Sequence, residues 1–185
     1  MNVAVFCGCG DEVSPFLLHE VEELGAALAE DGHAVIYGGA QGGCMGALAR
    51  GVRARQGHLV GVIPEMGFMD GKIHPDLVEQ LLVPDMSGRK AKMNALADAF
   101  LVLPGGIGTL DEAFEVLALK SCGSLLKPVI FYNYMGMWSP LLEAMELLAQ
   151  QRLVRHPLEQ LVQVLDKISD VRETLNNNAG IDAKS

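Results

Sequence analysis

The sequence lacks several features that mark common classes of protein. No lysine or arginine precedes Arg50, and the 185 residues together carry a net charge of −9. A general nucleic-acid binder is expected to present a basic face, so this charge argues against that role. An anion bound by the first third of the chain would therefore have to meet backbone N–H groups. No apolar run approaches the ~20 residues of a membrane helix, so no membrane association is expected.

The sequence also lacks the marks of secretion and of a metal site. Met1–Gly10 is apolar but contains no basic residue and is followed by Asp11 and Glu12, which is not the pattern of a signal peptide. The four cysteines form neither CxxC pairs nor a disulfide framework, and the five histidines are dispersed without metal-ligand spacing. Cys7-x-Cys9 is either a fragment of a redox or metal site or, more commonly, a pair of small residues ending a buried strand. We expect a cytoplasmic protein.

Short β-branched runs alternate with longer amphipathic stretches along the chain. The runs are almost continuously apolar, as expected of strands covered on both faces. Their alternation predicts an α/β fold, a doubly wound, mostly parallel Rossmann-like sheet of about six to seven strands with helices on both faces. Strands are predicted at Val3–Cys7, Ala34–Tyr37, Leu59–Ile63, Gln80–Val83, Phe100–Leu103, Val129–Tyr132 and, more weakly, Leu161–Val164. Helices are predicted at Pro15–Glu30, Cys44–Gln56, Met86–Ala97, Thr109–Ser121 and Met137–Gln150.

The length and composition fit one domain. Half of the residues are apolar and a fifth are charged, so a sizeable core is possible. We expect residues 1–175 to form a nucleotide-binding domain and residues 176–185 to form a flexible carboxyl-terminal tail. In the helix predicted for Pro15–Glu30, Phe16, Leu17 and Val21 are among the residues expected on the buried side.

Three glycine-rich turns are expected at the carboxyl edge of the sheet, where ligands of this fold class bind: Gly8–Gly10, Gly38–Gly46 and Gly105–Gly108. The third turn leaves a strand and enters a helix whose first N–H groups lack acceptors, and a phosphate is their natural ligand. Thr109 can cap that helix and donate its hydroxyl to an anion. A tight turn without a ligand is the alternative.

The common nucleotide fingerprints are absent. There is no GxxxxGK[ST] sequence, which argues against a P-loop. The first turn contains Gly8-x-Gly10, but Val13 stands where a dinucleotide site has its third glycine. The second strand ends in Tyr37-Gly38, where an NAD site requires an acidic residue, so NAD binding is disfavoured.

Two charged residues are predicted to face the same cleft. Arg89 and Glu112 each lie one turn into a helix that begins at the carboxyl edge of the sheet. Each alone is explained as well by a solvated helix face or by the helix dipole. Together, beside a phosphate-type turn, they favour a site.

The segment Pro104–Glu112 resembles the PGGxGTxxE motif of the lonely-guy (LOG) family. That family includes cytokinin-activating phosphoribohydrolases and bacterial proteins often labelled lysine decarboxylases. Arg89-Lys90 resembles the family's RK pair and lies at the family's distance from Glu112. The resemblance extends from about Met1 to Asp166. Further matching segments are Val5–Gly8, Tyr37–Gly39, Met45–Gly46, Gly61–Pro64 and Leu96–Phe100.

The resemblance implies hydrolysis of the N-glycosidic bond of a nucleoside 5'-monophosphate, either AMP or a cytokinin riboside monophosphate. It also implies no metal or organic cofactor, and a homodimer or an assembly of dimers. Glu112 is then the carboxylate that stabilises the oxocarbenium-like sugar and activates water, and Arg89 holds substrate oxygens or supports the departing base. The candidate substrate- and phosphate-binding residues are Gly8, Gly39, Met86, Lys90, Pro104, Gly105, Gly106, Ile107, Gly108 and Thr109.

The sequence also departs from the family pattern. Ser87 stands where the family often has histidine, Gly71 where a glutamate is common, and Ala118 where a threonine is common. These departures leave the preferred base open. One alternative function is a nucleotide or molybdenum-cofactor carrier on the same fold, without turnover. A second is a lysine decarboxylase, which needs a lysine Schiff base to pyridoxal phosphate; Lys90 is the only candidate in the cleft.

Overall fold

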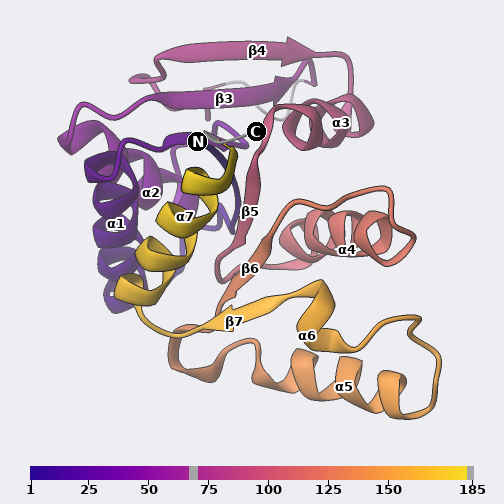
Figure 1. The fold of residues 1–185 in the computed structure, drawn as a ribbon. Coiled ribbons are helices and arrows are strands. Elements are labelled where there is room, and N and C mark those ends of the chain that lie inside the picture. Colours follow the sequence, from indigo (N-terminus) through magenta and orange to yellow (C-terminus); the bar gives the residue numbers. More distant parts are fainter. Residues whose placement is uncertain (67–70, 183–185) are drawn as a thin grey trace.

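The computed structural model describes residues 1–66 and 71–182, and it contains one sheet of seven parallel strands (Figure 1). The strand order is β4-β3-β2-β1-β5-β6-β7, which confirms the predicted doubly wound α/β fold. The chain changes direction across the sheet between β1 and β5, and ligands bind at such switch points. The strands are β1 (Asn2–Phe6), β2 (Ala34–Tyr37), β3 (Leu59–Pro64), β4 (Glu79–Val83), β5 (Ala99–Val102), β6 (Val129–Tyr132) and β7 (Gln163–Leu165).

Helices cover both faces of this sheet (Figure 1). Helices α1 (Pro15–Glu30), α2 (Gly43–Ala54) and α7 (Ile168–Asp182) pack on one face. Helices α3 (Met86–Leu96), α4 (Ile107–Ser121), α5 (Ser139–Gln150) and α6 (Leu158–Leu161) pack on the other. Across the described ranges, none of these helices combines the length and the apolar content that crossing a bilayer requires.

Successive side chains of the central strands point to opposite faces of the sheet and so form two hydrophobic cores, one on each face. Val3 and Val5 of β1 point to the α1, α2 and α7 face, whereas Ala4 and Phe6 point to the α3 and α4 face. The ring of Phe6 lies 5.8 Å from that of Phe100 on the neighbouring strand β5. The central strands are therefore buried on both sides, which explains their almost continuous apolar runs.

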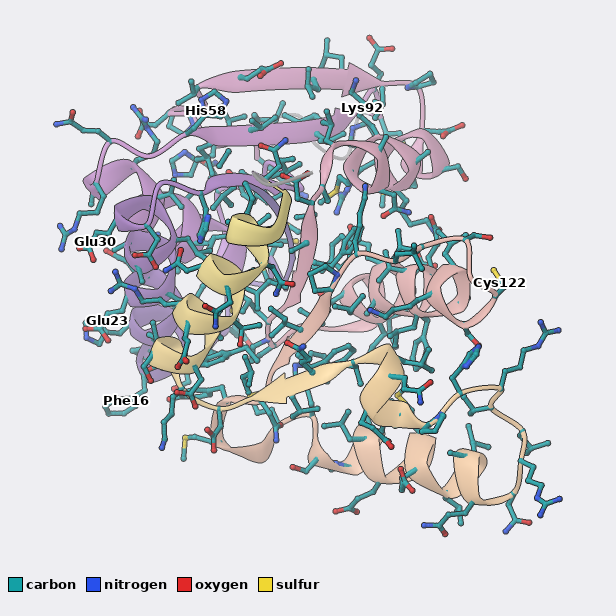
Figure 2. The ribbon with its side chains drawn as sticks, in the orientation of Figure 1. Phe16, Glu23, Glu30, His58, Lys92 and Cys122 are labelled. Atoms are coloured by element: carbon teal, nitrogen blue, oxygen red, sulfur yellow. The ribbon has the colours of Figure 1, made fainter. Side chains whose placement is uncertain are left out.

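Two burial predictions at the rim are wrong. Phe16 is 81 % exposed, because the first turn of α1 lies at the carboxyl edge of the sheet, and Figure 2 shows its side chain at the edge of the molecule. Strand β4 was expected to be covered on both faces, yet Glu79, Gln80 and Leu82 are exposed. The reason is that β4 is the last strand of the sheet and pairs only with β3.

The carboxyl-terminal part is more ordered than its composition predicts. Helices α6 and α7 were not predicted, and α7 continues through Asp182, so the segment expected as a flexible tail from Asn176 is helical up to that residue. Residues 183–185 of the predicted tail lie outside the described residues. Val171 and Leu175 of α7 are fully buried in the core shared with α1.

Candidate active site

The glycine-rich turn between β5 and α4 is tied to the turn that follows β1. The N–H of Gly8 donates a hydrogen bond to the carbonyl of Pro104 at 3.2 Å. A β-carbon on Gly105 would lie 2.8 Å from the Gly8 nitrogen and 2.1 Å from Thr109 Oγ1, so no side chain fits there. This close packing joins the two halves of the sheet at the switch point between β1 and β5.

The amino terminus of α4 is open. Gly106 is the N-cap residue, without a side-chain cap, and it is exposed together with Ile107 and Gly108. Thr109 does not cap the helix as predicted, because it sits on the third helical position and packs beneath Gly105. The first N–H groups of α4 therefore have no side-chain acceptor and point out of the positive end of the helix dipole.

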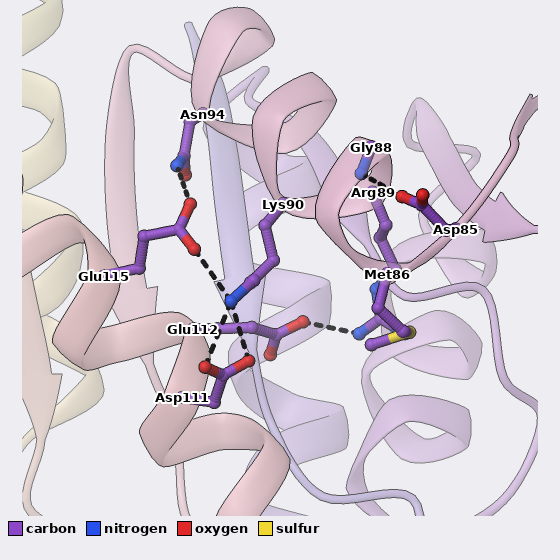
Figure 3. A network of polar contacts seen from close by, with 9 residues as sticks. All are labelled: Asp85, Met86, Gly88, Arg89, Lys90, Asn94, Asp111, Glu112 and Glu115. Carbon is purple, nitrogen blue, oxygen red and sulfur yellow. Dashed lines mark hydrogen bonds and ion pairs between the residues drawn. The ribbon is translucent and has the colours of Figure 1, made fainter.

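Arg89 of α3 and Glu112 of α4, which were predicted to face the same cleft, are in direct contact. The guanidinium Nη2 donates to Glu112 Oε1 at 2.5 Å, and the two side chains are only 8 % and 3 % exposed (Figure 3). Burial raises the pKa of the Glu112 carboxyl above its ordinary value, and the neighbouring Arg89 opposes this shift. The helix that carries Arg89 is capped by Asp85, whose carboxylate accepts from the Gly88 N–H at 2.7 Å.

The Arg89 guanidinium reaches across the edge of the sheet to the end of β2. A β-carbon on Gly38 would lie 2.7 Å from Arg89 Nη2 and 3.0 Å from its Cζ. Met86, a predicted substrate contact, lies beside the guanidinium, with its sulfur 4.0 Å from Nη1. Arg89 Nε is buried and has no partner among the described residues. A buried donor without a partner is uncommon in folded proteins and makes Arg89 Nε a candidate contact for a ligand oxygen.

Two other predicted ligand residues have evident contacts within the protein. Lys90 forms ion pairs with Asp111 and Glu115 at 2.9 and 2.8 Å. Gly39 has a φ of +79°, and a β-carbon there would lie 2.9 Å from Ile63 Cγ1. The role of Gly39 in the structure is thus to shape the turn after β2.

A cavity of about 980 Å³ opens on the other side of the glycine turn. Four predicted residues line it: Gly8, Pro104, Gly105 and Gly106. The rest of its wall comes from the start of α1 and the segment after β6, and is largely apolar. Gly10 and Cys44 of the wall belong to two of the glycine-rich turns that were expected at the ligand-binding edge. The other wall residues were not predicted as part of the site: Glu12, Val13, Ser14, Phe16, Leu17, Tyr134, Met135 and Met137.

The remaining predicted residues are not part of the cavity wall. They include Arg89 and Glu112, whose helices pack on the opposite face of the sheet from α1. The apolar wall could have been predicted from the position of its segments in the sequence. Both wall segments adjoin the carboxyl ends of parallel strands, which meet at the ligand-binding edge of such a sheet.

The cysteines near this edge are thiols with different surroundings. Cys7 and Cys44 are buried, and burial raises the pKa of Cys44 to about 11 and that of Cys7 well above its ordinary value. Cys9 is exposed. In residues 1–66 and 71–182, no group of three or more His, Cys, Asp or Glu side chains is arranged to hold a metal ion.

Comparisons with known proteins place these features in a family. A family model described as "possible lysine decarboxylase" matches residues 45–175. A cytokinin riboside 5'-monophosphate phosphoribohydrolase of Rhodococcoides fascians is 40 % identical over 146 residues, which cover 78 % of this chain and 74 % of that protein. A protein of the same name from Mycobacterium tuberculosis is 34 % identical over 169 residues, which cover 91 % and 90 % of the two chains.

Solved structures agree on the fold. The molybdenum cofactor carrier protein of Chlamydomonas reinhardtii superposes with a TM-score of 0.73 over 97 % of this chain and 98 % of that chain. At 17 % identity this likeness shows the fold alone. The sequence relatives go further, because they match most of the chain at 34–40 % identity. The chain therefore belongs to the lonely-guy (LOG) family, whose family model carries the description "possible lysine decarboxylase".

Proposed function

We propose that this protein hydrolyses the N-glycosidic bond of a nucleoside 5'-monophosphate to a free base and ribose 5-phosphate. The observation that carries the proposal is the buried pair of Arg89 and Glu112. Each residue lies one turn into its helix, and the amino terminus of the helix that carries Glu112 is open. The names of the relatives from Rhodococcoides fascians and Mycobacterium tuberculosis support the same reaction.

Glu112 has the chemistry that the bond cleavage needs. As the bond between ribose C1' and the base breaks, its electrons leave with the base and positive charge develops on the sugar. A carboxylate near C1' stabilises that charge and takes a proton from the attacking water, whose oxygen bonds to C1'. The departing base accepts a proton. Burial raises the pKa of Glu112, which makes its carboxylate a stronger base.

The other parts of the site supply binding. The exposed N–H groups of Gly106, Ile107 and Gly108 at the start of α4 suit the 5'-phosphate. Arg89 orients Glu112 and offers its unpartnered Nε to a substrate oxygen. The apolar cavity shares Gly105 and Gly106 with this turn, so it is placed to receive an apolar part of the substrate.

The test is release of base from a panel of nucleoside monophosphates that includes AMP and isopentenyladenosine monophosphate, followed by chromatography. Wild type should release base, whereas Glu112→Gln and Arg89→Met should lose most of that activity. Glu112→Gln keeps an acceptor for Arg89, so circular dichroism should show an unchanged fold. Binding of nucleotide without release of base by wild type would contradict the proposal and leave a carrier function.

Lysine decarboxylation fits the site less well. A lysine that forms a Schiff base must attack as the neutral amine. Lys90 lies between two carboxylates, and the hydrogen bonds that its ammonium donates to Glu115 and Asp111 raise its pKa, which stabilises the charged form. The Lys90 environment therefore favours a structural cation over a nucleophile.

We also propose that two copies associate through the exposed surfaces of α3 and α4. Ala91 and Ala95 on α3, and Ile107 and Phe114 on α4, are exposed beside the site. Apolar surface of this kind is a candidate interface between copies of a chain. Light scattering coupled to size exclusion should report a dimer, and Phe114→Lys should shift the population toward monomer.

A further inference from the structure

We infer that Lys90 is a positioning residue whose ammonium group ties α3 to α4 and thereby sets the geometry of the Arg89–Glu112 pair. This inference rests on the proposed function, because it concerns the same two residues. It replaces the expectation that Lys90 contacts the substrate phosphate. We call Lys90, Asn94, Asp111 and Glu115 the inter-helix brace.

The brace is a closed set of contacts between the two helices (Figure 3). Lys90 Nζ lies 2.9 and 3.0 Å from the two carboxylate oxygens of Asp111. It also lies 2.8 Å from Glu115 Oε2. The other oxygen of Glu115 accepts a hydrogen bond from Asn94 Nδ2 at 3.0 Å. Each helix thus contributes two side chains to the brace.

The sequence places the brace directly beside the reacting groups. Lys90 follows Arg89, and Asp111 precedes Glu112. Residues four apart lie on the same side of a helix, so Lys90 and Asn94 share one side of α3, and Asp111 and Glu115 share one side of α4. A change in the spacing of the helices at the brace must therefore move Arg89 relative to Glu112.

The two helices pack on the same face of the sheet through a shared apolar core that includes Met93 of α3 and Val116 of α4. Their backbones share few close approaches, in contrast to the extensive packing of α1 on α2. Near the carboxyl-terminal end of α3, Lys127, which lies between α4 and β6, donates from its Nζ to the carbonyl of Asn94 at 3.0 Å. The side-chain bridges of the brace and the Arg89–Glu112 pair therefore tie α3 directly to α4.

The ammonium of Lys90 is already occupied. It has three N–H donors, and two carboxylates surround it in the structure. Its side chain is only 17 % exposed. A phosphate could reach it only by displacing Asp111 or Glu115, and the brace would then open. Asp111 and Glu115 are themselves partly exposed, so these ion pairs contribute little to the free energy of unfolding. A displacement of catalytic groups by 1 Å, in contrast, can cost roughly 100-fold in rate.

The test compares kcat, KM and Tm for wild type, Lys90→Met, Lys90→Arg and the matched control Lys127→Met. Methionine keeps the length of the side chain but not the charge. We expect Lys90→Met to lower kcat about tenfold with KM changed less than about twofold, because positioning and not binding is lost. Lys90→Arg should restore most of kcat. Lys127→Met removes the hydrogen bond to the backbone carbonyl of Asn94, which joins α3 to the segment before β6 and not to α4, and should leave kcat within about twofold of wild type.

A second readout does not depend on turnover. In a crystal structure of Lys90→Met, the Arg89 Nη2–Glu112 Oε1 contact should lengthen or break, whereas Lys127→Met should keep it. If wild type releases no base, the proposed function fails and the crystal structures alone decide the role of Lys90. If wild type is active and Lys90→Met raises KM while kcat is unchanged, Lys90 is a substrate ligand and our inference is wrong. An intact Arg89–Glu112 contact in Lys90→Met would also overturn it.

Discussion

The guanidinium of Arg89 lies against the α-carbon of Gly38, at the point where β2 ends. A β-carbon at Gly38 would come within 2.7 Å of Arg89 Nη2 and 2.9 Å of Met45 Cε. Both atoms are at the far ends of flexible side chains. The absence of a side chain at position 38 therefore gives Arg89 the space to reach Glu112.

Gly38→Ala should displace Arg89 without unfolding the protein. We expect a loss of roughly 10- to 100-fold in kcat/KM, because the reacting groups move by a fraction of an ångström to 1 Å. The Tm should change little, since side-chain ends can move aside. The control is Gly180→Ala, which has open space around it. Equal activity of Gly38→Ala and wild type would show that the exact position of Arg89 is unimportant.

Adjacent glycines of the phosphate turn should respond differently to alanine. Gly105→Ala brings a β-carbon within 2.1 Å of Thr109 Oγ1 and 2.8 Å of the Gly8 nitrogen, so thermal unfolding should occur at a clearly lower temperature. Gly106→Ala meets nothing within 4 Å and should keep the wild-type Tm. In the proposed function the phosphate binds at this turn, so the methyl group should raise KM for the nucleotide about tenfold or more. An unchanged KM for Gly106→Ala would place the phosphate elsewhere.

The pH dependence of the reaction should report Glu112. Only the ionised carboxylate can stabilise the sugar cation, so kcat/KM rises as pH passes upward through the pKa of Glu112. Burial raises that pKa, which places the acid limb above the ordinary value of 4.5. Arg89 lowers the same pKa, so Gly38→Ala, which displaces Arg89, should move the limb to still higher pH. An acid limb at or below 4.5 in wild type would contradict this assignment.

The cysteines should react with iodoacetamide in a defined order. The thiolate is the reactive form. Cys122 is exposed, and hydrogen bonds with Ser124 lower its pKa, so it should be alkylated first (Figure 2). Burial raises the pKa of Cys7 and Cys44, which should react last. Mass spectrometry of peptides from a time course gives the order, and in denaturant the differences should largely disappear. Early labelling of Cys7 would indicate that the core opens readily.

Helix α7 should contribute to global stability. Leu175 is fully buried in the core shared with α1, so Leu175→Ala should lower the free energy of unfolding by about 2–5 kcal/mol. Asn177 lies on the exposed side of the same helix, and Asn177→Ala is the control. Chemical denaturation measures both. A loss below about 0.5 kcal/mol for Leu175→Ala, the range of ordinary surface changes, would mean that α7 folds separately from the sheet.

The parts of the fold that could be predicted depend on local signals. Strands β1, β2 and β6 are buried on both faces and read as continuous apolar runs. The turn from β5 into α4 is contained in one short glycine-rich segment. The exposure of β4 was not predictable in this way, because it depends on which strand ends the sheet. Helix α7 carries Asn176 and Asn177, which weakened its helical pattern, and its docking depends on a distant partner, α1.

The sequence predicted those site residues that combine a charged side chain with a position at the carboxyl edge of the sheet. Arg89 and Glu112 have charged side chains at the edge where helices begin, and the structure brings them together. The proximity of Gly38 to Arg89 is a long-range contact that no local pattern contains. The cavity wall was missed for another reason. Met135 lies in a short 3-10 helix after β6 and Met137 directly follows it. Such apolar residues carry no mark of ligand contact until the segments that meet them are known.

The cavity and the Arg89–Glu112 pair come from different elements on opposite faces of the sheet. A substitution at Phe16 or Met137 therefore changes the cavity wall without touching either charged residue. Substrate choice and reaction chemistry can diverge separately under mutation, since each depends on its own helices and loops. If the proposed function holds, related chains can acquire new preferences through the start of α1 and the segment after β6 while Arg89 and Glu112 stay constant.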